Sequence, residues 1–176
     1  ALAVGCAPVR HPGIQVRDTK SVLTTTTLVE LPGGQAAKLT VPHGSRSTSY
    51  AAVLLVGDWA AQPDSDEEPG SQSVLRDVAE ALAEAGYATL RVSDWPEGGK
   101  GIEAAWAWLQ KSRIADPGRI AVFVQGDAAY RALPLLRRLE PRALVLLGCP
   151  ARPFAKVALD RLPAALRATG GATRAE

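Results

Sequence analysis

The sequence has few residues of the kinds that build disulfide networks, metal sites and membrane spans. Its 176 residues include two cysteines, two histidines and no methionine. Two cysteines cannot form a disulfide framework, and the spacing of Cys6 and Cys149 matches no zinc-binding pattern. No apolar run approaches the roughly 20 residues that cross a bilayer. We therefore expect no membrane span, no metal and no other cofactor, and the absence of methionine predicts a natural start that lies upstream.

A large excess of charge of one sign is also missing. The chain carries 20 basic and 18 acidic side chains, which are interspersed and give a formal net charge of +2. A nucleic-acid-binding surface normally gathers basic residues into a patch or stripe, so we expect no nucleic-acid partner. With 47% hydrophobic and 22% charged residues, the composition is that of one soluble globular domain.

The first six residues resemble the end of a bacterial lipoprotein signal peptide, in which small apolar residues precede a cysteine that becomes lipidated. Ala3 stands where such signals usually carry leucine, and the alternative is an ordinary apolar start with a free cysteine. Lipidation of Cys6 would predict anchoring at the bacterial cell envelope, whereas a free cysteine leaves a cytoplasmic location open. We predict a signal-peptide remnant and tether over residues 1–20, one folded domain over 21–166 and a flexible tail over 167–176.

Strand-like and helix-like segments alternate through the folded part. Short apolar runs are typical of strands buried on both faces, and apolar residues at helical spacing lie between them. Because parallel strands need long crossovers, this alternation predicts a three-layer, doubly wound α/β fold with a mostly parallel sheet of about six strands and an amino-terminal antiparallel hairpin. The expected strands are 22–31, 37–41, 51–56, 88–92, 119–124 and 143–147, and the expected helices are 73–85, 102–109 and 127–139.

Ligands of open parallel sheets bind at the carboxyl ends of the strands. The residues that follow the four apolar strands are therefore the candidate site, and they include Cys149 after the last of them. We predict a crevice there, able to hold a small molecule or part of a protein partner. Its candidate members are Asp58, Trp59, Asp94, Trp95 and Asp127.

The order of the segments resembles the α/β-hydrolase superfamily. The resemblance is carried by the strand at 52–56, by the helix and strand of 77–88, by the helix and strand of 105–123, and by Arg152-Pro153-Phe154. It covers roughly residues 24–162 and depends on the ordered series, since no single motif is decisive. In that family a serine nucleophile stands on a sharp turn between a strand and a helix.

At the corresponding turn this sequence carries glycine. The five places of the turn fall on residues 124–128, which puts Gly126, between Gln125 and Asp127, in the place of the serine. Glycine has no side chain that could attack a carbonyl or be acylated. Gly57-Asp58 stands where the family has a His-Gly oxyanion loop, and a carboxylate there would repel the developing negative charge.

Two further departures point the same way. His11 and His43 both precede the parallel strands, so neither matches the triad histidine in chain order. Pro134 falls inside the helix after the turn, where a missing hydrogen bond predicts that the helix is kinked or starts late. We accordingly expect a degenerate and carboxyl-terminally truncated member of the superfamily.

Asp127 allows several interpretations. A turn shifted by one residue would make it the nucleophile, as in aspartate-dependent members, but a supporting base would still be lacking. Together with Asp58 and Asp94 it could bind a hard cation in a regulatory module. The simpler interpretation, which we favour, is that these are turn and cap residues, with Asp127 as the N-cap of the next helix.

These observations lead to two main hypotheses about function. The first is a non-catalytic domain that binds a small molecule or protein at the cell envelope. The second is a hydrolase of ester or amide bonds that uses an unrecognised nucleophile or a carboxyl-terminal segment beyond residue 176.

Overall fold

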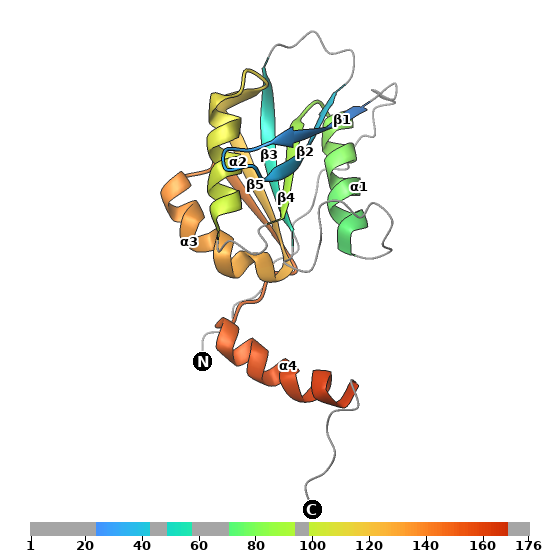
Figure 1. The fold of residues 1–176 in the computed structure, drawn as a ribbon, viewed down its shortest axis with the longest axis vertical. Helices are drawn as coiled ribbons and strands as arrows, with labels where there is room; N and C mark the ends of the chain where they lie inside the picture. Colours follow the sequence, from blue (N-terminus) through green and yellow to red (C-terminus); the bar gives the residue numbers. More distant parts are fainter. Residues whose placement is uncertain (1–23, 43–48, 58–70, 94–98, 169–176) are drawn as a thin grey trace, which may run out of the picture.

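A six-stranded mixed sheet forms the centre of the computed structural model, which describes residues 24–42, 49–57, 71–93 and 99–168. The strands lie in the order β1-β2-β4-β3-β5-β6 (Figure 1). The antiparallel hairpin of β1 and β2 is joined to β4 in antiparallel sense, and the remaining neighbours are parallel. The predicted fold class is thereby confirmed. The strands are β1 (Thr24–Glu30), β2 (Ala36–Pro42), β3 (Tyr50–Gly57), β4 (Ala88–Ser93), β5 (Ala115–Gln125) and β6 (Ala143–Leu147).

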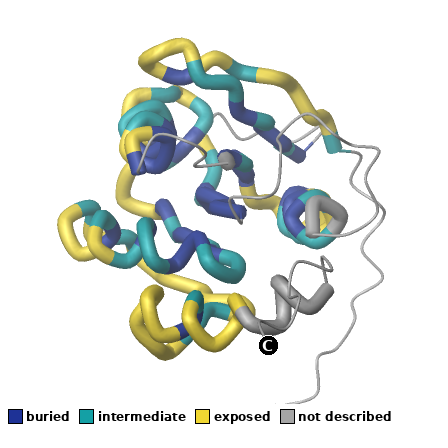
Figure 2. Tube along the Cα trace, turned by 60° about the horizontal axis from the view of Figure 1, so that its bottom comes forward, coloured by how far each residue is buried: buried dark blue, intermediate teal, exposed yellow. Residues whose placement is uncertain are grey.

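Helices cover both faces of the sheet, which gives the three layers. Helix α1 (Ser71–Glu84) lies on one face, and α2 (Lys100–Lys111) and α3 (Ala129–Leu139) lie on the other (Figure 1). The fourth helix, α4 (Phe154–Ala168), extends away from the sheet, and exposed residues predominate along its described part (Figure 2).

The central strand β3 is buried on both faces, as its continuous apolar run predicts. Leu54 and Val56 pack into the larger core with α2 and α3, whereas Val53 and Leu55 pack against α1. Successive side chains of a strand point to opposite faces, so the run 53–56 supplies both cores at once. The helix that precedes β4 ends as predicted, because Gly86 adopts a left-handed φ of +94°.

Strand β5 begins earlier than the sequence pattern indicates. The sequence pattern predicts the strand at 119–124, after the turn-forming residues Asp116-Pro117-Gly118, but the strand already starts at Ala115. The register to β3 shifts between Tyr50 and Ala52, and the Asp116 Oδ1 atom accepts a hydrogen bond from the Gly118 N–H at 2.9 Å. The turn chemistry is therefore present, but as an irregularity within the paired strand.

Strand β6 is apolar but exposed. It pairs with β5 on one side and forms the edge of the described sheet, and all five of its residues are exposed. The side chains of Leu144, Val145, Leu146 and Leu147 remain 41–50% exposed. A hydrophobic run predicts a strand, but it does not report how many neighbours that strand has.

Helix α3 corrects the expectation that it starts late. It runs without interruption from Ala129 to Leu139 and includes Pro134 in its interior. Pro134 is exposed, so its ring meets solvent on the outer side of the helix, while Ala129, Ala132 and Leu136 are buried on the inner side. Tertiary packing of the inner face outweighs the local cost of the proline.

Two fully buried threonines face each other across β2 and β4. Thr40 and Thr89 are paired in the register, and each has 0% relative exposure. The hydroxyl oxygens of Thr40 and Thr26 are 2.9 Å apart in a hydrogen bond, whereas Thr89 Oγ1 has no hydrogen-bond partner in the described part of the chain. The two buried hydroxyls therefore contribute to stability with opposite sign.

We expect Thr89→Val to raise the free energy of unfolding by about 1 kcal/mol, because it removes an unsatisfied buried hydroxyl while keeping the shape of the side chain. The matched Thr40→Val change breaks a hydrogen bond and is expected to lower that free energy by about 0.5–1 kcal/mol. Urea unfolding of both variants measures the difference. Equal stabilisation by the two changes would contradict this account.

Candidate functional site at the carboxyl ends of the parallel strands

The parallel strands end together, as the candidate site requires. Gly57 of β3 pairs with Ser93 of β4, Val56 pairs with Val124 of β5, and Gln125 pairs with Leu147 of β6. Continuing the register by one residue aligns Gly57 with Gln125. The carboxyl ends of β3, β4, β5 and β6 therefore lie side by side at one end of the sheet.

A sharp turn connects β5 to α3 at the carboxyl end of the sheet. Gln125 is still extended, with φ −106° and ψ 134°, and it is followed at once by a single 3₁₀ turn, Gly126–Ala128, and then by α3. Gly126 has a φ of +59°, in the left-handed region that glycine adopts more readily than other residues. A strand, one left-handed residue and a helix form the sharp strand-to-helix connection on which nucleophile elbows are built.

Asp127 is not the helix N-cap that we predicted. The N-cap position of α3 is Ala128 and that of the 3₁₀ turn is Gln125, and neither makes a side-chain cap hydrogen bond. The Oδ2 atom of Asp127 instead accepts a hydrogen bond from Nη1 of Arg161, at 3.0 Å, in an ion pair. The side chain of Asp127 is 20% exposed. Because Arg161 belongs to α4, this ion pair joins α4 to the turn.

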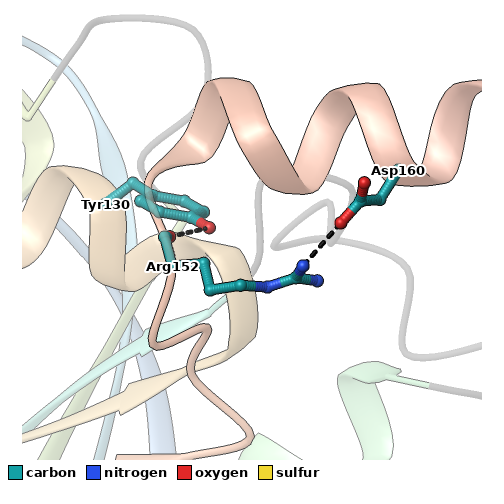
Figure 3. Close-up of polar contacts among 3 residues, drawn as sticks. All are labelled: Tyr130, Arg152 and Asp160. Carbon is teal, nitrogen blue, oxygen red and sulfur yellow. Dashed lines mark hydrogen bonds and ion pairs between the residues drawn. The ribbon is translucent and has the colours of Figure 1, made fainter.

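The segment before α4 is also fastened to α3. The hydroxyl of Tyr130 donates a hydrogen bond to the carbonyl oxygen of Arg152, at 2.8 Å, and the guanidinium of Arg152 pairs with Asp160, 8 residues further on within α4 (Figure 3). The ring of Phe154 meets that of Tyr130 edge to face, with centroids 5.3 Å apart. The start of α4 is therefore positioned beside the first turn of α3.

Cys149 lies just beyond the end of β6 and is half-buried. Its Sγ atom is 3.4 Å from the carbonyl oxygen of Val124 and 3.7 Å from that of Leu147. The thiol thus donates to backbone carbonyls at the carboxyl end of the sheet. These contacts tie the chain after β6 to the end of β5.

Several predicted site residues lie outside the described residues. These are Cys6, Asp58, Trp59, Asp94 and Trp95, so the lipid attachment, the oxyanion loop, the crevice and the three-carboxylate cation site stay predictions. His11 and His43 also lie outside the described ranges. Within those ranges, no group of three or more His, Cys, Asp and Glu side chains is arranged to hold a metal ion.

The sequence pattern missed the residues that join α4 to the site. Tyr130, Arg152 and Arg161 each act through a contact with a residue 8 to 34 positions away. Exposed arginines and a single tyrosine carry no periodic signal in the sequence. The only hint was the Arg152-Pro153-Phe154 segment, which carried part of the resemblance to the α/β-hydrolases.

Comparison with known proteins finds solved structures that share this fold. No family model matches the sequence, and no curated protein matches it. Among solved structures, the esterase domain of a Rhodothermus marinus protein is 19% identical and matches 74% of this chain and 52% of its own, with a TM-score of 0.54. A dienelactone hydrolase-like promiscuous phosphotriesterase from metagenomic libraries is 16% identical and matches 72% of this chain and 59% of its own, with a TM-score of 0.54.

An esterase from the fungus Rhizomucor miehei is 17% identical and matches 76% of this chain and 46% of its own, with a TM-score of 0.52. This chain therefore spans about half the length of the solved structures that it matches. Together with the sheet order and the two helical layers, these matches show that the chain has the α/β-hydrolase fold. Within the described residues, no helix is both long and apolar enough to cross a bilayer.

Proposed function

We propose that this domain acts by binding a small molecule or a protein partner, and that it does not catalyse hydrolysis with an elbow nucleophile. The observation that carries the proposal is Gly126, which occupies the left-handed position between β5 and α3. The elbow of a hydrolase presents a nucleophilic side chain there, and glycine presents none.

The neighbouring carboxylate is a poor substitute for the missing nucleophile. Asp127 is engaged by the guanidinium of Arg161 at 3.0 Å. A carboxylate nucleophile must reach the substrate carbon, and a base must then activate water to release the intermediate. No histidine belongs to the described residues, so none of them supplies an imidazole as that base.

The carboxyl end of the sheet nevertheless has features suited to binding. The ion pair of Asp127 with Arg161 and the aromatic pair of Tyr130 with Phe154 both lie beside the turn. Charged and aromatic side chains at the carboxyl ends of parallel strands are typical of ligand sites in this fold class. The predicted crevice residues Asp58, Trp59, Asp94 and Trp95 would add further charged and aromatic side chains to this site.

The proposal is tested with a broad fluorophosphonate probe. We expect no adduct by intact mass and no turnover of simple activated esters. We expect the same result for Gly126→Ser, because a serine without a base remains unactivated. A specific adduct on one residue of the unmodified protein, with turnover lost when that residue is replaced, would instead establish a hydrolase that uses another nucleophile.

Stability of the same variant tests the geometry of the turn. A serine forced to the left-handed φ of Gly126 is expected to lower the free energy of unfolding by about 1–2 kcal/mol. Gly118→Ser is the matched control, because Gly118 is exposed, its φ lies outside the left-handed region, and an added Cβ would make only an ordinary contact at 3.5 Å. Equal losses in the two variants would contradict a strained turn at residue 126.

The location of the domain at the bacterial cell envelope is the second half of the proposal. It depends on Cys6, which would be lipidated if the first six residues belong to a lipoprotein signal. A protein expressed from its natural gene in bacteria should then carry acyl mass on Cys6 and partition with membranes. An unmodified thiol at Cys6 would remove this half of the proposal and leave the binding function untouched.

A further inference from the structure

An open cavity lies at the opposite end of the sheet from the candidate site, where the parallel strands begin. Its volume is about 510 Å³, which falls within the range of small-molecule sites in proteins. The floor consists of small apolar side chains from three neighbouring strands, including Val53 of β3, Ala121 of β5 and Ala143 of β6, which are paired in one row of the register. Val53 precedes Gly57 by four residues, so the cavity is about 13 Å from the candidate site along the strand.

The sequence explains why this part of the sheet is hollow. Helix α1 packs over Val53 and Leu55 through Leu75 and Ala79. Beyond them, Ala121 of β5 is only partly buried and Ala143 of β6 is exposed. Alanine side chains at these positions fill little volume, so an apolar depression remains beside α1.

Two arginines and a tyrosine are among the residues that line the cavity. Arg119 and Arg142 both line it, together with Tyr87, which follows the end of α1. The N–H of Arg142 donates to the carbonyl oxygen of Ile120 at 2.8 Å, which fixes the backbone of Arg142 beside Ile120, the residue that follows Arg119. Two arginines that are 23 positions apart in the sequence are thereby held at one opening.

Neither guanidinium is neutralised within the described ranges. Arg119 and Arg142 form no ion pair there, and no lining residue of the cavity is acidic. The nearest carboxylates in the sequence are Asp116 for Arg119 and Glu140 for Arg142; neither residue lines the cavity, and Asp116 accepts a hydrogen bond from the Gly118 N–H. The rim therefore offers two positive charges and a phenolic hydroxyl without a matching negative group.

We propose that this cavity binds a small organic phosphate, with the phosphate on Arg119 and Arg142 and an apolar group over the alanine floor. A guanidinium presents paired N–H donors that match phosphate oxygens, and the Tyr87 hydroxyl can donate a further hydrogen bond. Two guanidinium charges suit a dianion better than a monoanion. A phosphate monoester is thus favoured over a carboxylate of the same size.

Titration of the whole chain with phenyl phosphate, followed by backbone amide NMR, tests this proposal. We expect saturable shifts around residues 51–53, 118–121 and 142–143, with no corresponding shifts at 125–128. Inorganic phosphate and benzoate, each lacking one half of the ligand, should bind more weakly than phenyl phosphate. Because both arginines are exposed, affinity should also fall as salt is raised.

Three variants and a control test whether the arginines are responsible for binding. Arg119→Gln and Arg142→Gln should each weaken phenyl phosphate binding by about tenfold, the loss expected when one charged hydrogen-bonding partner is removed. Arg142→Lys, which keeps the charge but loses the paired donors, should weaken it less. Arg137→Gln on the exposed side of α3 is the matched control and should leave binding unchanged.

Three results would overturn the proposal. They are the absence of saturable shifts with phenyl phosphate, unchanged binding in both glutamine variants, and an equal loss in Arg137→Gln, which would indicate general attraction to a positive surface. Spectra of the free variants show whether each is folded. This test measures amide shifts at the amino ends of the strands. Its failure is therefore distinct from failure of the binding function proposed for the carboxyl ends.

Discussion

The Leu54→Ala variant is expected to lose about 2–5 kcal/mol of unfolding free energy, the largest effect of any change considered for this protein. Leu54 is 0% exposed in the central strand β3 and belongs to the core formed with α2 and α3. Its neighbours come from strands on both sides, so they cannot move together to close the space left by the missing atoms. Urea unfolding monitored by circular dichroism measures the loss.

Leu28→Ala provides the control for the same chemical change. Leu28 lies in β1 and is 61% exposed, so its truncation removes little buried surface. We expect a change of no more than about 0.5 kcal/mol, as for most surface substitutions. Similar losses at residues 28 and 54 would mean that β3 is not the centre of the core.

Replacement of Pro134 by alanine should stabilise the protein by about 1–3 kcal/mol, because proline in a helix interior is disfavoured by roughly 3 kcal/mol relative to alanine. The proline lacks the N–H that would bond to the carbonyl of Tyr130 four residues earlier. Its side chain is exposed, so the change removes no core contact. The gain is partly offset because an alanine chain has more freedom when unfolded. Thermal and urea unfolding would both report it.

Pro153→Ala separates helix position from the general effect of removing a proline. Pro153 precedes α4, and its carbonyl oxygen accepts hydrogen bonds from the N–H groups of Lys156 and Val157. At the start of a helix the missing N–H of proline costs nothing. We expect no gain there, and a gain equal to that at Pro134 would contradict the explanation.

The fold was predictable because its strongest signals are local. The apolar run at 53–56, the left-handed Gly86 and the Pro-Gly-Gly turn of the hairpin each specify one element without reference to the rest of the chain. Alternation of strands and helices then limits the topology to a parallel sheet with two helical layers. What failed was local detail, such as the start of β5, where pairing with Tyr50 extends the strand through an expected turn.

The candidate site was predictable only in part, because its side-chain contacts join distant segments. Counting along β5 led to Gly126, and the structure has a turn there, with Gly126 in the left-handed region. The partner of Asp127 could not be inferred, since Arg161 lies 34 residues away and reaches the turn only because α4 is positioned by Tyr130 and Phe154. Local propensity favours an aspartate as a helix cap, and here a tertiary ion pair prevails.

The strand order also bears on how the chain assembles during synthesis. Strands β2 and β3 are consecutive in the sequence, yet β4 lies between them in the sheet. The amino-terminal hairpin is therefore translated first, but it has no sheet to join until residues 88–93 have left the ribosome. Until then β3, in which residues 51–56 are all apolar, lacks both of its neighbours. Such late, non-local pairing is typical of slow folding, and it leaves a hydrophobic segment exposed on the nascent chain.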